Sequence, residues 1–160
     1  DDNHFLDLMT SMSKIAETYQ LPIIYSMHPR SKKMIERRGF KLHPLIKPYE
    51  PFGFFDYIKL QLSAKAVLSD SGTLSEESAI LGFRALLIRT STERPEAVEA
   101  GTIRLAGIKE DQVLNALKQT LDSKVIKDIP KDYLITNVSD RVCQIITSHI
   151  PLINERIWRK

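Results

Sequence analysis

The turn segment SDSGTLSEESAILG, residues 69–82, carries the residue types and the spacing best suited to binding chemistry. It follows a short apolar run and leads into a helical pattern, so its small polar residues lie where a predicted strand gives way to a predicted helix. The first N–H groups of a helix attract an anion, Gly72 has no side chain to block a phosphate, and Ser71 and Thr73 bring hydroxyl donors. In the alternative interpretation the turn is only a cap, with Thr73 as N-cap and Glu76 completing a capping box. Spacing alone does not separate a phosphate site from this cap.

Three further polar side chains are expected near the same edge of the predicted sheet. His28 and Arg94 follow predicted strands, and Glu77 lies in the first turn of the helix just described. Ligands of open parallel α/β sheets bind beyond the carboxyl ends of the strands, where a guanidinium can meet a diphosphate and a carboxylate can accept both ribose hydroxyls. Each residue also has an ordinary alternative. Arg94 can pair with Glu93 or Glu96, Glu77 can simply complement the helix dipole, and a lone histidine after a strand is more often structural.

Four aromatic residues gather in one segment, where their rings can stack on a nucleotide base or can form core: Phe52, Phe54, Phe55 and Tyr57. The sequence has no Cys/His metal-ligand set, no G-x-x-x-x-G-K-[ST] loop and no G-x-G-x-x-G fingerprint. A metal site, an ATPase and a dinucleotide dehydrogenase therefore lose support.

Strand and helix patterns alternate along the chain, which predicts right-handed β-α-β crossovers and a parallel sheet with helices on both faces. The second strand pattern is weakened by Pro44, Gly39 and Gly82 are expected as helix C-caps, and residues 127–140 form the only long irregular stretch. The expected strands are residues 21–28, 40–46, 66–70, 84–90 and 102–107, and the expected helices are 3–19, 29–39, 50–65, 73–81, 95–101, 110–121 and 138–150.

The composition is that of an ordinary globular domain. The chain has 160 residues, 42% hydrophobic and 27% charged, and its 23 basic residues are dispersed among 20 acidic ones, for a net charge of +3. This distribution is no nucleic-acid footprint, and no apolar run approaches the roughly 18 residues of a membrane span. The single cysteine, Cys143, lies in the apolar helical pattern RVCQII and is predicted to be a buried free thiol, which fits a reducing compartment.

Two motifs together resemble the non-hydrolysing UDP-N-acetylglucosamine 2-epimerase family: LSDSGTLSEESAILG (68–82) and IRTSTERPEAVEAGT (88–102). The resemblance extends over residues 1–160 and implies the C-terminal half of a GT-B-type enzyme, which holds its nucleotide between two Rossmann-like domains. The segment HPLIKPYEPFGFFDYIKLQ (43–61) and the C-terminal INERIWRK are most similar to the UDP-N-acetyl-L-fucosamine synthase branch, which serves capsule and O-antigen assembly. The family also implies a cytoplasmic homodimer that acts on a UDP-sugar.

The family's diphosphate and ribose contacts map onto five residues. Ser71, Gly72 and Thr73 match the diphosphate-binding segment, although the family often has a second glycine where this chain has Thr73. Glu77 matches the acid that binds the ribose, and Arg94 matches the arginine of the T-E-R-P segment near the phosphates.

The uracil and sugar contacts follow from the same resemblance. Tyr57 falls where an aromatic ring lies against uracil, with Phe55 as a close rival, and His28 matches a histidine near the sugar nucleotide. The implied reaction needs no metal or redox cofactor. UDP leaves by anti elimination with loss of the C2 proton, and it adds back after protonation on the opposite face.

The resemblance also implies that this chain is one part of the enzyme. The family's catalytic carboxylates lie in its N-terminal domain, and its His-Arg-Glu-Glu-Asn segment and the first strand of the C-terminal domain are expected upstream of Asp1. We therefore expect the chain to bind UDP with its own N-terminal domain as partner, to carry no catalytic residue and to be inactive alone. The alternatives are a GT-B glycosyltransferase with a UDP-sugar donor and a non-catalytic UDP-sugar-binding module.

Overall fold

The computed structural model describes residues 2–125 and 128–159. The chain divides into two compact units, Asp1–Ile129 and Pro130–Lys160. We describe each unit separately.

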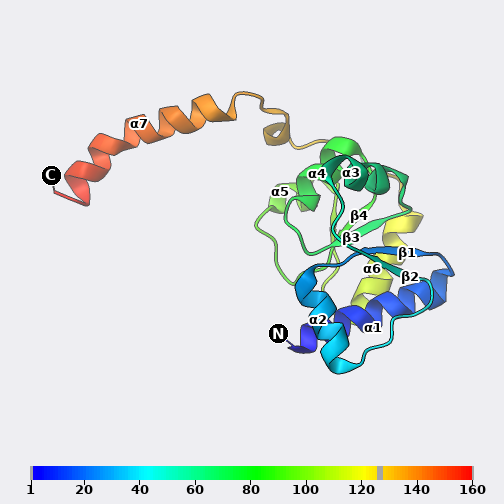
Figure 1. The fold of residues 1–160 in the computed structure, drawn as a ribbon. Coiled ribbons are helices and arrows are strands. Elements are labelled where there is room, and N and C mark those ends of the chain that lie inside the picture. Colours follow the sequence, from blue (N-terminus) through cyan, green and yellow to red (C-terminus); the bar gives the residue numbers. More distant parts are fainter. Residues whose placement is uncertain (1, 126–127, 160) are drawn as a thin grey trace. The chain divides into compact units, whose positions relative to one another are not determined.

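The first unit alternates helices and strands from its first element to its last (Figure 1). The prediction of an α/β fold is confirmed. The elements are α1 (Asp2–Tyr19), β1 (Ile23–Ser26), α2 (Pro29–Arg38), β2 (Ile46–Tyr49), α3 (Phe54–Ser63), β3 (Val67–Ser69), α4 (Leu74–Leu81), β4 (Ala85–Leu87), α5 (Pro95–Glu99), β5 (Arg104–Leu105) and α6 (Glu110–Asp122).

All five strands are parallel, and within the described residues they form two separate ladders. One sheet has the order β1-β2 and the other β3-β4-β5. Ile23 lies opposite Ile46 in the first sheet, and Leu68 lies opposite Leu86 in the second. The expectation of parallel strands is confirmed. The expected single sheet is instead two sheets, because β1 and β3 do not pair with each other among the residues that the structure describes.

The second strand does not lie where the sequence pattern places it. Strand β2 is Ile46–Tyr49 rather than residues 40–46, and it contains Pro48 opposite Tyr25. The Ile46 N–H turns back to the His43 carbonyl instead of joining the β1 ladder. Pro48 has the same parity as Ile46, so its missing N–H belongs to the side facing away from β1, where a proline is tolerated.

The helix caps follow the sequence more closely. Gly39 ends α2 with φ of 62°, and Gly82 ends α4 with φ of 72° and donates its N–H to the Ser78 carbonyl at 2.9 Å. Both predicted C-caps are confirmed, and both use the left-handed conformation that favours glycine.

Helix α1 contributes to two hydrophobic clusters among the described residues of the first unit. Ile15 packs with Leu86 of β4 and with α6, whereas Met9 and Met12 pack with Ile46 of β2. One helix therefore covers parts of both sheets.

The second unit consists of a 3₁₀ turn (Lys131–Leu134) and the long helix α7 (Val138–Arg156), which continues past the predicted end through Pro151. None of the α7 residues is buried, and Cys143 is exposed, so the predicted buried thiol is wrong. The pattern RVCQII is apolar as a core helix would be, but in this unit no packed layer covers it. Among the described residues, no helix has both the length and the apolar character needed to cross a membrane.

Candidate functional site

The turn between β3 and α4 is held by side-chain hydrogen bonds of its own. The Ser71 N–H donates to Ser69 Oγ at 3.0 Å, and Ser71 Oγ lies 3.0 Å from Thr73 Oγ1. Thr73 precedes α4, but its side chain makes no cap hydrogen bond, and the Glu76 carboxylate binds Arg94 instead of the helix start. The alternative interpretation as a capping box is therefore wrong, because both of its side chains have other partners.

The backbone of this turn leaves two amides for a ligand. The Leu74 N–H donates to the Ser71 carbonyl at 3.3 Å, and the Ser75 N–H donates to the Gly72 carbonyl at 3.1 Å. In the described part of the chain, the N–H groups of Gly72 and Thr73 make no such bond. These two amides, rather than the first amides of α4, are the ones that can meet an anion.

Gly72 and Arg94 lie against each other, although 21 intervening residues separate them in the sequence. A Cβ added at Gly72 would collide with Arg94 Nη1 and would lie 3.0 Å from Cζ. The guanidinium is oriented from its other side, where Nε donates to Glu76 Oε1 at 2.5 Å. Both side chains of this ion pair are about one-third exposed (31% and 33%), so the positive group faces the surface beside the turn. The structure thus brings the predicted phosphate turn and the predicted arginine together.

Glu93, one of the two alternative partners expected for Arg94, binds a different arginine in the structure. Glu93 binds Arg89 through both carboxylate oxygens, at 2.9 and 2.7 Å. The hydrogen bonds from Arg89 hold the pKa of Glu93 below its ordinary value, with a smaller contribution from the Arg94 charge.

Glu77 is positioned by a residue that the sequence did not single out. Gln61 on α3 is 2% exposed, and its Nε2 donates to Glu77 Oε2 at 2.6 Å. Tyr57 lies one turn before Gln61 on the same helix. Burial raises the pKa of the Tyr57 hydroxyl above its ordinary value, and the nearby charges of Glu77 and Asp70 add to this effect. The only available signal for Gln61 was an amide within the apolar stretch YIKLQL, four residues after Tyr57.

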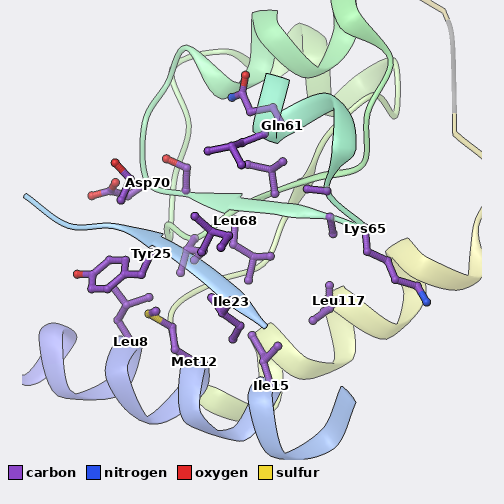
Figure 2. Close-up of a pocket in the computed structure, with 18 of the residues that line it drawn as sticks. Leu8, Met12, Ile15, Ile23, Tyr25, Gln61, Lys65, Leu68, Asp70 and Leu117 are labelled. Atoms are coloured by element: carbon purple, nitrogen blue, oxygen red, sulfur yellow. The ribbon is translucent and has the colours of Figure 1, made fainter. Parts of the chain in front are cut away.

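A cavity of about 1250 Å³ lies between β1 and β3 (Figure 2). Its polar lining includes His28, Tyr57 and Asp70, whereas Ser71, Gly72, Thr73, Glu77 and Arg94 are not among its lining residues. The predicted site residues therefore form two groups. One lines the cavity, and the other surrounds the β3–α4 turn, which continues directly from Asp70.

His28, Tyr57 and Phe55 differ in their exposure and in whether they line the cavity. His28 is exposed and is the N-cap of α2, with Nδ1 accepting from the Arg30 N–H at 3.2 Å. Phe55 is 85% exposed and packs edge-on against Phe54, with 5.5 Å between ring centroids. Tyr57 lines the cavity and Phe55 does not. The geometry favours Tyr57 as the ring that can meet a base, and it gives His28 a structural role that does not prevent a ligand contact.

Chemically, the β3–α4 turn combines a guanidinium, two backbone amides and two hydroxyls within one small surface. Such a set suits a diphosphate, and the adjacent Glu77 carboxylate suits a pair of hydroxyls. In the parts of the chain that the structure describes, no three His, Cys, Asp or Glu side chains gather as a metal site.

Comparison with protein families matches residues 1–147 to the family model described as UDP-N-acetylglucosamine 2-epimerase. The UDP-N-acetylglucosamine 2-epimerase of Methanococcus maripaludis is 36% identical over 120 residues, which are 72% of this chain and 33% of the relative. The chain thus spans about a third of the length of this curated relative.

Two solved structures agree with this match. The UDP-N-acetylglucosamine 2-epimerase of Rickettsia bellii superposes with a TM-score of 0.80 at 35% identity, covering 100% of this chain and 45% of the other. The enzyme of Methanocaldococcus jannaschii, solved in complex with UDP-GlcNAc and UDP, gives a TM-score of 0.80 at 30% identity, covering 92% of this chain and 41% of the other.

Proposed function

Because the chain belongs to the UDP-N-acetylglucosamine 2-epimerase family, we propose that it supplies the UDP-binding half of a UDP-sugar 2-epimerase. The observation that carries this proposal is the contact of the Arg94 guanidinium with the backbone of Gly72 at the carboxyl end of β3. A guanidinium that lies close to Gly72, in a turn with two amides at the end of a parallel strand, is suited to a nucleoside diphosphate.

The diphosphate is proposed to contact Arg94, the amides of Gly72 and Thr73, and the Ser71 hydroxyl. Glu76 orients the guanidinium through Nε, so that Nη1 lies over Gly72. A phosphate on this surface would meet several donors at once, and charge-assisted hydrogen bonds of this kind are about twice as strong as neutral ones.

The nucleoside is proposed to lie between α3 and the start of α4. Glu77 accepts the ribose hydroxyls, and Gln61 holds its carboxylate in place through the 2.6 Å hydrogen bond. Tyr57 supplies a ring for uracil. His28, at the end of β1, is proposed to lie near the sugar.

In the reaction that we propose, this half of the site stabilises the leaving group. A base removes the C2 proton as the C1–O bond to UDP breaks, which gives a glycal and free UDP. UDP then adds back to C1, and a proton is delivered to C2 on the opposite face. The guanidinium and the amides of the β3–α4 turn stabilise the charge that develops on departing UDP. The base and the acid are proposed to come from an N-terminal domain of the same polypeptide.

The finer identity is also a proposal. The motifs at residues 43–61 and at the C-terminus support a UDP-N-acetyl-L-fucosamine synthase, which makes its product from a UDP-linked 6-deoxy-L-talosamine derivative for capsule or O-antigen. In this proposal the chain is the C-terminal nucleotide-binding domain of a two-domain GT-B-type enzyme that works as a cytoplasmic homodimer.

The first test is a calorimetric titration with UDP, with ADP as the control nucleotide. Ser71→Ala and Arg94→Ala should weaken UDP binding, each by about 10-fold or more, because each removes a donor to a charged group. Ser139→Ala and Arg141→Ala are matched controls on exposed positions of α7. Absence of UDP binding by folded full-length protein would refute the site.

A second experiment tests the reaction class. Full-length protein in D₂O should introduce deuterium at C2 of the UDP-sugar, because epimerisation exchanges that proton with solvent. A glycosyltransferase would transfer the sugar to an acceptor without exchange, and a binding module would do neither.

A further inference from the structure

Hydroxyl side chains alternate with other residues along the β3–α4 turn, at Ser69, Ser71 and Thr73. The structure joins them in sequence, because the Ser71 N–H donates to Ser69 Oγ at 3.0 Å and Ser71 Oγ lies 3.0 Å from Thr73 Oγ1. We infer that Thr73 is a positioning residue for the diphosphate: its hydroxyl donates to Ser71 Oγ and so directs the Ser71 proton toward a phosphate oxygen. This inference rests on the proposed function, in which Ser71 contacts the diphosphate.

The backbone of Ser71 is held by one neighbour, but its hydroxyl needs another. The bond to Ser69 uses the Ser71 N–H and fixes the backbone just after β3. It leaves the Ser71 side chain free to choose among the staggered positions about χ1. Among the described residues, Thr73 is the side chain to which the Ser71 hydroxyl is bonded. Thr73 therefore decides where this hydroxyl lies.

The pair of hydroxyls retains a proton for a ligand. Each hydroxyl can donate its own proton and can accept through its lone pairs, so the bond between them uses one proton and leaves the other. When Thr73 donates to Ser71, the proton that remains is the one on Ser71, which directly precedes the Gly72 amide. Accepting a hydrogen bond also makes the Ser71 hydroxyl a stronger donor, because hydrogen bonds in a chain polarise one another.

Thr73 can serve Ser71 because it does not cap α4. Its side chain makes no cap hydrogen bond at the start of that helix. Glu76, which would complete a capping box, binds Arg94 instead. Thr73 is also exposed, so burial does not fix its side chain. The bond to Ser71 is therefore the contact that explains a hydroxyl at this position.

The backbone at Thr73 does not require the glycine that the family often has there. Its φ of −63° and ψ of −19° are open to every L-residue. Threonine is β-branched and stiff about χ1, so it holds its hydroxyl in place with little loss of side-chain freedom. A glycine would leave the Ser71 hydroxyl without this partner.

A direct contact of Thr73 with the phosphate is the main alternative, and it makes a different prediction. If Ser71 and Thr73 each bound the phosphate independently, their substitutions would weaken binding additively. If Thr73 acts through Ser71, its hydroxyl contributes only while the Ser71 hydroxyl is present. Residues of one hydrogen-bonded network show such non-additivity, and a double-mutant cycle measures it.

Calorimetric titration of the full-length protein with UDP tests this dependence. Thr73→Val keeps the shape of the side chain without its hydroxyl and should raise the Kd by about 3-fold to 10-fold, as expected for one neutral hydrogen bond. Thr73→Ser keeps the hydroxyl and should bind UDP within about 2-fold of the unsubstituted protein. Adding Thr73→Val to Ser71→Ala should raise the Kd by less than about 2-fold beyond Ser71→Ala alone. Thr10→Val, at an exposed position of α1, is the matched control and should leave the Kd unchanged.

The outcomes separate this inference from the proposed function. If the full-length protein binds no UDP, both are refuted. If Arg94→Ala weakens UDP binding but Thr73→Val does not, the proposed function stands and the inference is wrong. Equal losses in Thr73→Val and Thr73→Ser would show that the hydroxyl does not act. An equal loss from Thr73→Val with and without the Ser71 hydroxyl would indicate a direct contact or a purely structural role, and either would overturn the inference.

Discussion

Gly72→Ala is the substitution that most directly tests the contact between the β3–α4 turn and Arg94. The new methyl group would occupy the space of Arg94 Nη1 and would lie 3.0 Å from its Cζ. The guanidinium is the end of a flexible side chain, so it moves rather than the backbone. Its hydrogen bond to Glu76 and its position against Gly72 are then lost together.

The expected effects on stability and binding differ in size. Losing a partly exposed ion pair costs about 1 kcal/mol or less, and replacing glycine at a negative φ recovers up to about 1 kcal/mol through the unfolded chain. The free energy of unfolding should therefore change by less than about 1 kcal/mol. Losing one charge-assisted hydrogen bond to the diphosphate costs about 1.5–3 kcal/mol, which raises the Kd for UDP by about 10-fold to 150-fold.

Calorimetric titration with UDP measures the Kd, and unfolding in urea measures the free energy of unfolding. Gly53→Ala is the matched control. Gly53 also has a negative φ, −65°, and a Cβ there would have Asp56 Oδ2 as its nearest neighbour at 4.0 Å. It should bind UDP like the unsubstituted protein. UDP binding by folded Gly72→Ala with an unchanged Kd would refute the reasoning, as would an equal loss in the Gly53→Ala control.

Three further predictions follow from the same structure. Glu77→Ala should weaken UDP binding by about 10-fold or more while leaving 2′,3′-dideoxy-UDP unaffected, and calorimetry showing equal losses for both ligands would contradict a ribose contact. The raised pKa of Tyr57 means that folding favours its protonated form, so stability is full below about pH 10 and falls as pH rises through the folded pKa. Tyr57→Phe should reduce this loss in urea unfolding between about pH 9 and about pH 11, and an identical decline in both proteins would be evidence against it. Cys143 should react with a thiol reagent in the native 160-residue chain within about threefold of its rate in the unfolded chain, whereas strong protection would show that it is covered.

The order of helices and strands could be predicted because it depends on local periodicity. Apolar spacing identified α1 and α6 nearly to the residue, and Gly39 and Gly82 ended their helices as expected. The second strand was expected at residues 40–46, in a pattern weakened by Pro44, and nothing local indicates that the strand instead runs from Ile46 to Tyr49 with Pro48 facing away from the ladder. Cys143 was misjudged for a related reason, since periodicity shows an apolar face but not whether another element covers it.

Some site residues could be predicted because ligands of parallel α/β sheets bind beyond the carboxyl ends of the strands, and others could not. Ser71, Gly72 and Arg94 were expected at one edge, and their mutual contact agrees with that expectation. The partner of Arg94 was not foreseen, because Glu76 was considered only in the alternative interpretation, as part of a capping box. Gln61 was missed because its bond to Glu77 joins two different helices, and the two residues are 16 positions apart in sequence. Such contacts depend on how elements pack and not on the pattern within either one.

The failed cap and the binding site have the same physical origin. A T-x-x-E sequence at a helix start normally satisfies its own amides, and losing such a cap costs about 1 kcal/mol. Here Thr73 turns to Ser71, and Glu76 turns to Arg94, which places a guanidinium beside a helix N-terminus that is itself positive. The side chains that would satisfy the turn in a capping box are therefore used elsewhere, and the amides of Gly72 and Thr73 are left for another partner. A local rule is thus broken where an anion would complete the hydrogen bonds of the turn, as expected of a binding site rather than a turn built only for stability.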